Sequence, residues 1–140
     1  MKGKKPAKSL QIVDLLNQAL KLEYSLIIHI PRIASSITDE KTREMALILE
    51  NTAIKHADIV ARAISELGGS PEWVFGPAPA GEDIVEIFQK QLDREKLALQ
   101  LHQDSASLIQ DRNLKLTFDQ MARDHERHIQ IINNILERLS

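Results

Sequence analysis

Apolar residues recur every three or four positions along four long segments of the chain, which is the spacing of an amphipathic helix. The first segment is expected from Ser9 to Ser36, the second from Thr38 to Gly68, the third from about Gly81, and the fourth from about 114 to 139. Their apolar stripes are Leu16, Leu20, Ile27 and Ile30; Met45, Leu49, Val60, Ala63 and Leu67; Phe88, Leu92, Leu99, Ala106 and Ile109; and Phe118, Met121, Ile132 and Ile135. The pattern predicts an all-α protein of four long helices.

Local signals predict where these helices begin and end. Thr38 is expected to cap the second helix, with Asp39 and Glu40 in its first turn, where acidic side chains favour the helix dipole. The run GGSP, which starts at Gly68, is typical of a helix C-terminus. Pro31 has no backbone N–H, so we expect it to kink or end the first helix.

One connection is much longer than the others. The stretch SPEWVFGPAPAGE joins the second and third segments, whereas the turn QDRN is short. A short loop joins antiparallel neighbours, while a long one can cross the bundle. We therefore expect an antiparallel four-helix bundle domain over residues 9–140 with one crossover, after a disordered basic tail over residues 1–8. The segment 73–75 (Trp-Val-Phe) is expected to cover the bundle or to form a dimer contact.

The chain also contains an internal repeat. At an offset of 72 residues, QIVDLLNQALKLE (11–23) aligns with DIVEIFQKQLDRE (83–95). The same offset places Glu23 on Glu95 and His56 on His128. Matching residues in separate helices at one offset favour two related helix hairpins packed with pseudo-twofold symmetry.

Polar side chains interrupt the apolar stripe of every helix near its middle. These residues are Glu23, His56, Glu95, His125 and His128. Buried carboxylates and imidazoles need partners, and one bound cation would supply a partner to all of them. Because His125 and His128 are three residues apart, their rings share one helical face. The set predicts a divalent metal site whose charge suits one ion, or two ions bridged by solvent.

Other interpretations of the polar residues remain open. A metal-free network of His–Glu ion pairs would satisfy the same groups, and the protein would then be a structural or interaction module. His102 continues the inner stripe of the third helix, so we expect it beside the site or lining a cavity. Asp124 lies one turn before His128 and is a fallback ligand. His29 lies off its stripe and is expected at the surface or at an interface.

Composition narrows the class of protein. The chain has 140 residues, a formal net charge of −2 and no cysteine. This charge argues against nucleic-acid binding, and the absence of cysteine excludes thiolate metal sites and disulfides. No apolar run approaches the roughly 20 residues of a membrane-spanning helix. We therefore expect a cytoplasmic protein without a membrane or nucleic-acid partner.

The chain resembles the ferritin-like superfamily, the bacterioferritin and rubrerythrin branch in particular. LNQALKLEYSLI (16–27), KHADIVARAISELGGSP (55–71), QLDREKLALQLHQDSA (91–106) and DHERHIQIINNIL (124–136) are similar to the four ligand-bearing helices of that family. The resemblance implies a ferritin-like bundle in which Glu23, His56, Glu95 and His128 are terminal metal ligands. It also implies that iron is the first choice of metal, with zinc, copper, nickel or cobalt as alternatives.

The chain departs from the family at both bridging positions. The family has a bridging glutamate three residues before each ligand histidine, and here those positions hold Ala53 and His125. The resemblance therefore implies an altered, mononuclear site in which His125 replaces a bridge, and ferroxidase activity is put in doubt. An oxidoreductase linked to iron or oxygen stays open and would need an external electron donor. A homodimer is expected, and a cage that stores iron is the third alternative.

Overall fold

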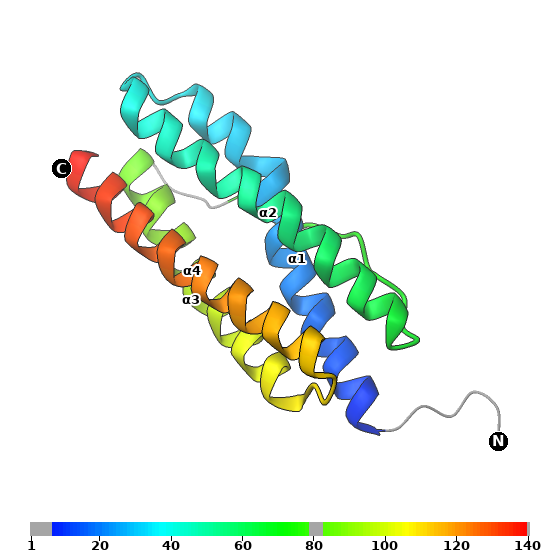
Figure 1. Ribbon diagram of the computed structural model, residues 1–140. Coiled ribbons are helices and arrows are strands. Elements are labelled where there is room, and N and C mark those ends of the chain that lie inside the picture. Colours follow the sequence, from blue (N-terminus) through cyan, green and yellow to red (C-terminus); the bar gives the residue numbers. More distant parts are fainter. Residues whose placement is uncertain (1–6, 79–82, 140) are drawn as a thin grey trace.

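The computed structural model describes residues 7–78 and 83–139, and those residues form four helices and no strand. The helices are α1 (Ala7–Ser35), α2 (Glu40–Glu66), α3 (Ile84–Leu108) and α4 (Arg112–Leu139) (Figure 1). The predicted all-α architecture is thus confirmed. Most of the predicted tail, residues 1–6, lies outside the described residues, and α1 begins two residues before the expected boundary.

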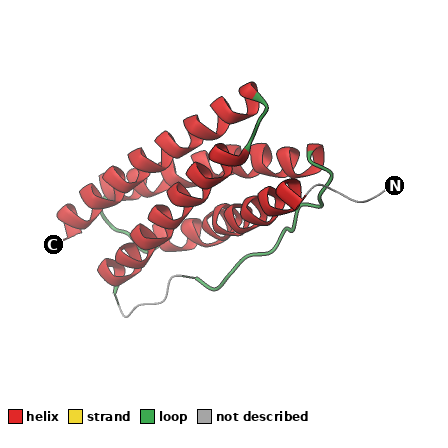
Figure 2. Ribbon diagram, turned by 90° about the horizontal axis from the view of Figure 1, so that it is seen from below, coloured by secondary structure: helices red, strands yellow, loops and turns green. Residues whose placement is uncertain are grey.

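The helices form two hairpins that pack side by side. α1 packs against α2 and α3 against α4, and the hairpins meet where α1 contacts α3 and α2 contacts α4. All these neighbours are antiparallel, because the long connection between α2 and α3 runs back along the bundle before α3 begins (Figures 1 and 2). The predicted crossover is therefore present, and it makes the diagonal helices α2 and α3 parallel.

Aspartates cap three of the helices. The sequence-based choice of Thr38 for α2 was wrong: the cap is Asp39, whose carboxylate accepts from the N–H of Thr42 at 3.0 Å. Asp83 accepts from the N–H of Glu86 at 2.9 Å, and Asp111 from that of Leu114 at 2.8 Å. In each case the carboxylate reaches the amide three residues ahead, one of the donors that a helix start leaves without a partner.

The end of α2 has the geometry that GGSP predicts. Gly68 has a φ of 84°, and the N–H of Gly69 bonds to the carbonyl of Ile64 at 2.9 Å while that of Gly68 bonds to Ser65 at 3.0 Å. This is a Schellman motif, which needs a left-handed residue after the last helical turn. At α1, by contrast, Pro31 does not end the helix, which continues to Ser35.

The crossover is attached to α1. Its Gly76 carbonyl lies 2.8 Å from Nε2 of His29, and its Gly76 N–H donates to the hydroxyl of Ser25 at 2.8 Å. Tyr24 makes edge contacts with Trp73 and Phe75, at ring-centroid distances of 5.5 and 5.7 Å. His29 is therefore a half-buried anchor of the connection, which corrects the expectation of a surface or interface role.

The hydrophobic core is divided into two halves. One half contains Leu16, Leu20, Ile64, Phe118 and Met121, and the other contains Ile30, Leu49, Phe88, Ile132 and Ile135. On every helix the residues of the two halves are separated along the sequence by polar residues that are also buried. We call these residues the polar layer: Glu23, His56, Glu95, His102, His125 and His128. The fold thus places a polar layer at mid-height between two apolar halves.

Candidate metal centre

All members of the polar layer are withdrawn from solvent. The five side chains selected from the sequence are each 1 or 2% exposed, and His102 is 0% exposed. They come from all four helices, because each helix reaches mid-height at a polar position in its apolar stripe. The structure therefore brings the predicted residues together, and it adds His102 to them.

The first group within the layer surrounds one oxygen of Glu23. Its Oε1 lies 2.6 Å from Nε2 of His125, 3.3 Å from Nδ1 of His56 and 3.6 Å from Nε2 of His102. The four ligand atoms lie within 4.8 Å of one another, and each comes from a different helix. Three imidazoles and a carboxylate at this separation could hold a metal ion.

The second group lies around Glu95 and shares one residue with the first. Oε1 of Glu95 is 2.7 Å from Nδ1 of His128, and its Oε2 is 3.1 Å from Nδ1 of His125. These three side chains also have their ligand atoms within 4.8 Å. The five predicted residues therefore do not surround a single point; they fall into two groups that share His125.

The electrostatics of the metal-free layer centre on His125. Burial alone would lower the pKa of His125, but the carboxylates of Glu23 and Glu95 raise it to about 10. Burial alone would likewise raise the pKa of each carboxyl, but the charge and hydrogen bonds of the imidazoles lower the pKa of Glu23 well below its usual range and also lower that of Glu95. Without metal, the layer is an imidazolium between two carboxylates.

The ion pairs leave some of the buried polar atoms without a hydrogen bond. Within the described residues these atoms are Oε2 of Glu23, both ring nitrogens of His102 and Nε2 of His128. Burial lowers the pKa of His102, which favours the neutral ring that metal coordination requires. Orphaned donor atoms are costly in a core, and a bound cation would compensate for them. The chemistry of the residues therefore fits a metal ion.

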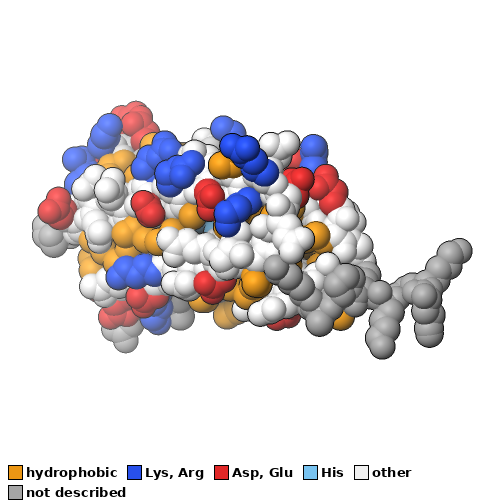
Figure 3. All heavy atoms as spheres, turned by 60° about the horizontal axis from the view of Figure 1, so that its bottom comes forward, with side chains coloured by type: hydrophobic (Ala, Val, Ile, Leu, Met, Phe, Trp, Pro, Cys, Tyr) orange, Lys and Arg blue, Asp and Glu red, His pale blue; other side chains and the backbone are white. Residues whose placement is uncertain are grey.

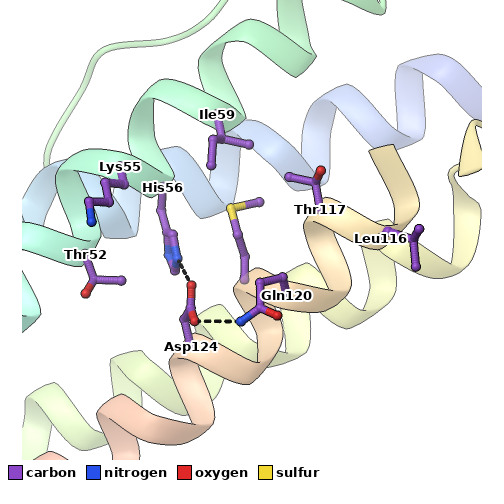
Figure 4. A pocket seen from close by; sticks show the side chains of 9 residues that line it. Thr52, Lys55, His56, Ile59, Leu116, Thr117, Gln120 and Asp124 are labelled. Atoms are coloured by element: carbon purple, nitrogen blue, oxygen red, sulfur yellow. Dashed lines mark hydrogen bonds and ion pairs between the residues drawn. The ribbon is translucent and has the colours of Figure 1, made fainter. Parts of the chain in front are cut away.

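Asp124 supports the layer from the α2–α4 side. Its Oδ2 lies 2.9 Å from Nε2 of His56, and its Oδ1 accepts from Gln120 at 3.1 Å (Figure 4). The other ring nitrogen of His56, Nδ1, faces Glu23. A carboxylate that holds the far nitrogen of a histidine is a usual feature around metal ligands. Asp124 thus contacts a histidine of the first group but belongs to neither group. It lies farther from the centre of the layer than a fallback ligand would.

Two surface pockets lie between α2 and α4, next to the polar layer. A pocket of about 370 Å³ is lined by His56, Asp124 and Lys55 among others (Figure 4). A neighbouring pocket of about 230 Å³ is lined by His128 and Arg127 among others. The molecular surface has a mixed character, with lysines and arginines interspersed with acidic and apolar side chains on the face shown in Figure 3. The two pockets therefore lie next to His56 and His128, which are themselves only 2% exposed.

Comparison with known proteins identifies the family. The model of the ferritin-like domain matches residues 13–140, so the chain belongs to the ferritin-like family. Among curated proteins, none matches the chain significantly. The described residues contain no helix that is long and apolar enough to cross a membrane.

Solved structures show the same fold. A ferritin-like, diiron-carboxylate protein from Bacillus anthracis is 20% identical, with a TM-score of 0.82 over 94% of this chain and 99% of that one. Rhodobacter capsulatus bacterioferritin, solved with a metal-free dinuclear site and haem iron, is 24% identical, with a TM-score of 0.74 over 100% of this chain and 91% of that one. A dodecameric thioferritin from Bacteroides fragilis is 19% identical, with a TM-score of 0.79 over 99% and 90% of the two chains. The predicted ferritin-like bundle is confirmed.

Proposed function

We propose that this protein binds divalent metal at the centre of its bundle, with Glu23, His56, Glu95, His125 and His128 as ligands divided between the two groups. The observation that carries the proposal is the set of buried donor atoms that no hydrogen bond satisfies, on Glu23, His102 and His128. A cation at the layer would satisfy these atoms together and offset the two buried carboxylates. The smallest occupancy is one ion per chain, held by one of the two groups. That occupancy corresponds to the mononuclear site that the sequence predicts.

The donor set gives the preference among metals. Imidazole nitrogens suit iron, zinc, copper, nickel and cobalt, whereas magnesium and calcium prefer oxygen ligands. We propose iron first, because family members of the same fold include a diiron-carboxylate protein and bacterioferritins. The site is altered, since Ala53 and His125 stand where the family has bridging glutamates. Bound iron would supply one-electron chemistry toward O₂ or peroxide, with electrons from an external donor, while the two core halves exclude bulk water.

Elemental analysis of the untagged protein tests this function. We expect at least one equivalent of a transition metal per chain, as isolated or after reconstitution, and at least tenfold weaker binding at the altered group in the Glu23→Gln and His128→Gln variants. The matched control is His29→Gln, which removes the one histidine of the five that lies outside the polar layer and leaves the layer intact. Less than about 0.2 equivalents of any transition metal in both preparations would contradict the proposal.

A second candidate function is a metal-free structural or interaction bundle. It is favoured by the pairing of His125 with both Glu23 and Glu95, which gives each carboxylate a charged partner without any ion. This candidate predicts that thermal unfolding does not change when iron, zinc or copper is added. A rise of the melting temperature in proportion to the logarithm of metal concentration would exclude it.

We also propose a homodimer. The crossover segment Trp73, Val74 and Phe75 covers Tyr24 on its own bundle but remains 51–52% exposed, so an apolar strip is left for a partner. Light scattering is expected to give twice the chain mass of 15.8 kDa, and Phe75→Ser should shift the protein toward monomer. A large assembly would instead support the iron-storing cage. The cytoplasmic location stays a prediction.

A further inference from the structure

His125 faces both groups of the polar layer with different atoms. Its Nε2 lies 2.6 Å from Oε1 of Glu23, and its Nδ1 lies 3.1 Å from Oε2 of Glu95. The two nitrogens of an imidazole are separate ligand positions that point away from one another. The ring of His125 thus takes part in two ligand sets. The first set uses its Nε2 and the second set uses its Nδ1.

His102 completes the first of these sets. It is fully buried, neither of its nitrogens makes a hydrogen bond, and its Nε2 is 3.6 Å from the same Glu23 oxygen that His56 and His125 approach. With His102 the first group has three imidazoles and one carboxylate, which is the number of ligands that zinc takes in structural sites. A core histidine whose role was only structural would be expected to find a hydrogen-bond partner.

The internal repeat relates the two groups. Each hairpin supplies one Glu–His pair, Glu23 with Nδ1 of His56 and Glu95 with Nδ1 of His128. His125 has no matching histidine, because the residue at the same offset in the first hairpin is Ala53. One shared ring, rather than two bridging carboxylates, therefore connects the two halves of the layer.

We propose that His125 bridges two divalent ions as an imidazolate. The first ion is held by Glu23, His56, His102 and Nε2 of His125; the second is held by Nδ1 of His125 with Glu95 and His128. This inference rests on the proposed metal-binding function and specifies its ligands and stoichiometry. The class of ion is a divalent transition metal that favours imidazole ligands, and Cu²⁺ serves as the probe because its unpaired electron reports coupling between two ions.

Protons and charges can be followed through this arrangement. A ring bound to metal through both nitrogens has no N–H, so metal binding releases every ring N–H proton of His125 to solvent. The imidazolate, Glu23 and Glu95 then carry three negative charges against the four positive charges of two divalent ions, and Asp124, which also pairs with Arg127 at 3.2 Å, is a fourth carboxylate beside the site. Asp124 is a positioning residue, because it accepts from Nε2 of His56 at 2.9 Å and so leaves Nδ1 for the first ion.

Copper titration of the metal-free, untagged full chain tests the bridge. Elemental analysis after dialysis is expected to give two Cu²⁺ per chain. Electron paramagnetic resonance should count far fewer spins than bound copper, because an imidazolate couples the two ions antiferromagnetically. His128→Gln is expected to retain one Cu²⁺ with a full spin count. His102→Gln should weaken the affinity for the first ion by about tenfold or more, and Asp124→Asn should weaken it by about 10–100-fold.

The controls separate this inference from the function on which it rests. His29→Gln is expected to keep both ions and the reduced spin count, and far-ultraviolet circular dichroism checks that every variant folds. One Cu²⁺ per chain, unaffected by His102→Gln, would overturn the inference and leave the metal-binding function standing. Two ions with a full spin count in the unaltered protein would overturn the bridge. Failure to bind any ion would overturn both.

Discussion

At the scale of single residues, the chemistry of the site depends on His125. It is 1% exposed and lies between two carboxylates that belong to different helices. In the metal-free protein it is the ion-pair partner of both carboxylates, and under the proposed function it becomes a metal ligand. His125 can therefore partner the two carboxylates without metal and can bind a metal ion when one is present. A glutamate at the same position could do only the second.

Replacing this residue by glutamate should make the fold depend on metal. His125→Glu puts three carboxylates together and removes their cationic partner, so we expect the metal-free variant to lose about 3–5 kcal/mol of stability. Added Fe²⁺ or Zn²⁺ should restore the loss, since bridging carboxylates are what a two-metal centre at about 3.5–4 Å requires. Urea unfolding with and without metal measures both effects, and equal loss in the two conditions would contradict the prediction.

At the scale of elements, the helix ends and the hairpin contacts depend on close-range geometry. Gly69 follows the Schellman turn of α2, and a Cβ built there would lie 2.7 Å from Cγ1 of Val13 on α1. The turn can therefore pack against α1 only because this residue has no side chain. By contrast, a Cβ at Gly76 would meet Lys21 at 3.6 Å, an ordinary contact.

These two glycines make a matched pair of variants. Gly69→Ala is expected to cost about 1–3 kcal/mol, because α1 or the turn must shift to admit the methyl group. Gly76→Ala should change stability far less. Thermal unfolding of both variants measures the difference. In the double variant Gly69→Ala/Val13→Ala much of the loss should be recovered, and strict additivity of the two changes would argue against the contact.

The cap of α2 predicts an acid-dependent contribution to stability. Hydrogen bonds from Thr42 and Arg138 lower the pKa of Asp39 from 3.8 to about 2. A lowered folded-state pKa means that the contribution is fully present above pH 3.8 and is lost as the pH falls through about 2. Asp39→Asn keeps an oxygen for the cap but cannot titrate. Urea midpoints of the two proteins should therefore converge as the pH is lowered across this window, and a constant difference would contradict the assignment.

At the scale of the whole molecule, the polar layer divides an otherwise continuous core. Apolar halves lie above and below it, while the layer itself contains buried polar atoms that have no hydrogen-bond partner. The fold should therefore exist in the metal-free protein and become more stable when metal binds.

Metal binding should therefore raise the melting temperature. At a free concentration 100 times the dissociation constant, one bound ion adds about 2.7 kcal/mol, which corresponds to roughly 10 °C for a domain of this size. Differential scanning fluorimetry with Zn²⁺ measures the shift. The Glu23→Gln/Glu95→Gln double variant is expected to lose most of it, and an equal shift in that variant would assign the binding to the surface.

The sequence by itself determined the four helices, the crossover and the five polar positions at mid-height. Helical periodicity is local, so it places Glu23, His56, Glu95, His125 and His128 on the inner faces without knowledge of neighbouring helices. Periodicity does not decide the helix caps, because Thr38 and Asp39 are both good caps and only the backbone geometry distinguishes them.

Only the tertiary structure decided how the polar residues are grouped. The direction of each His125 nitrogen, the approach of His102 to Glu23 and the contact of Asp124 with His56 are distances between helices far apart in the sequence. They depend on side-chain rotamers and on how the helices pack, and periodicity specifies neither. The sequence could therefore name the residues of one polar layer, whereas the packing of four helices divided that layer into two groups around a single shared ring.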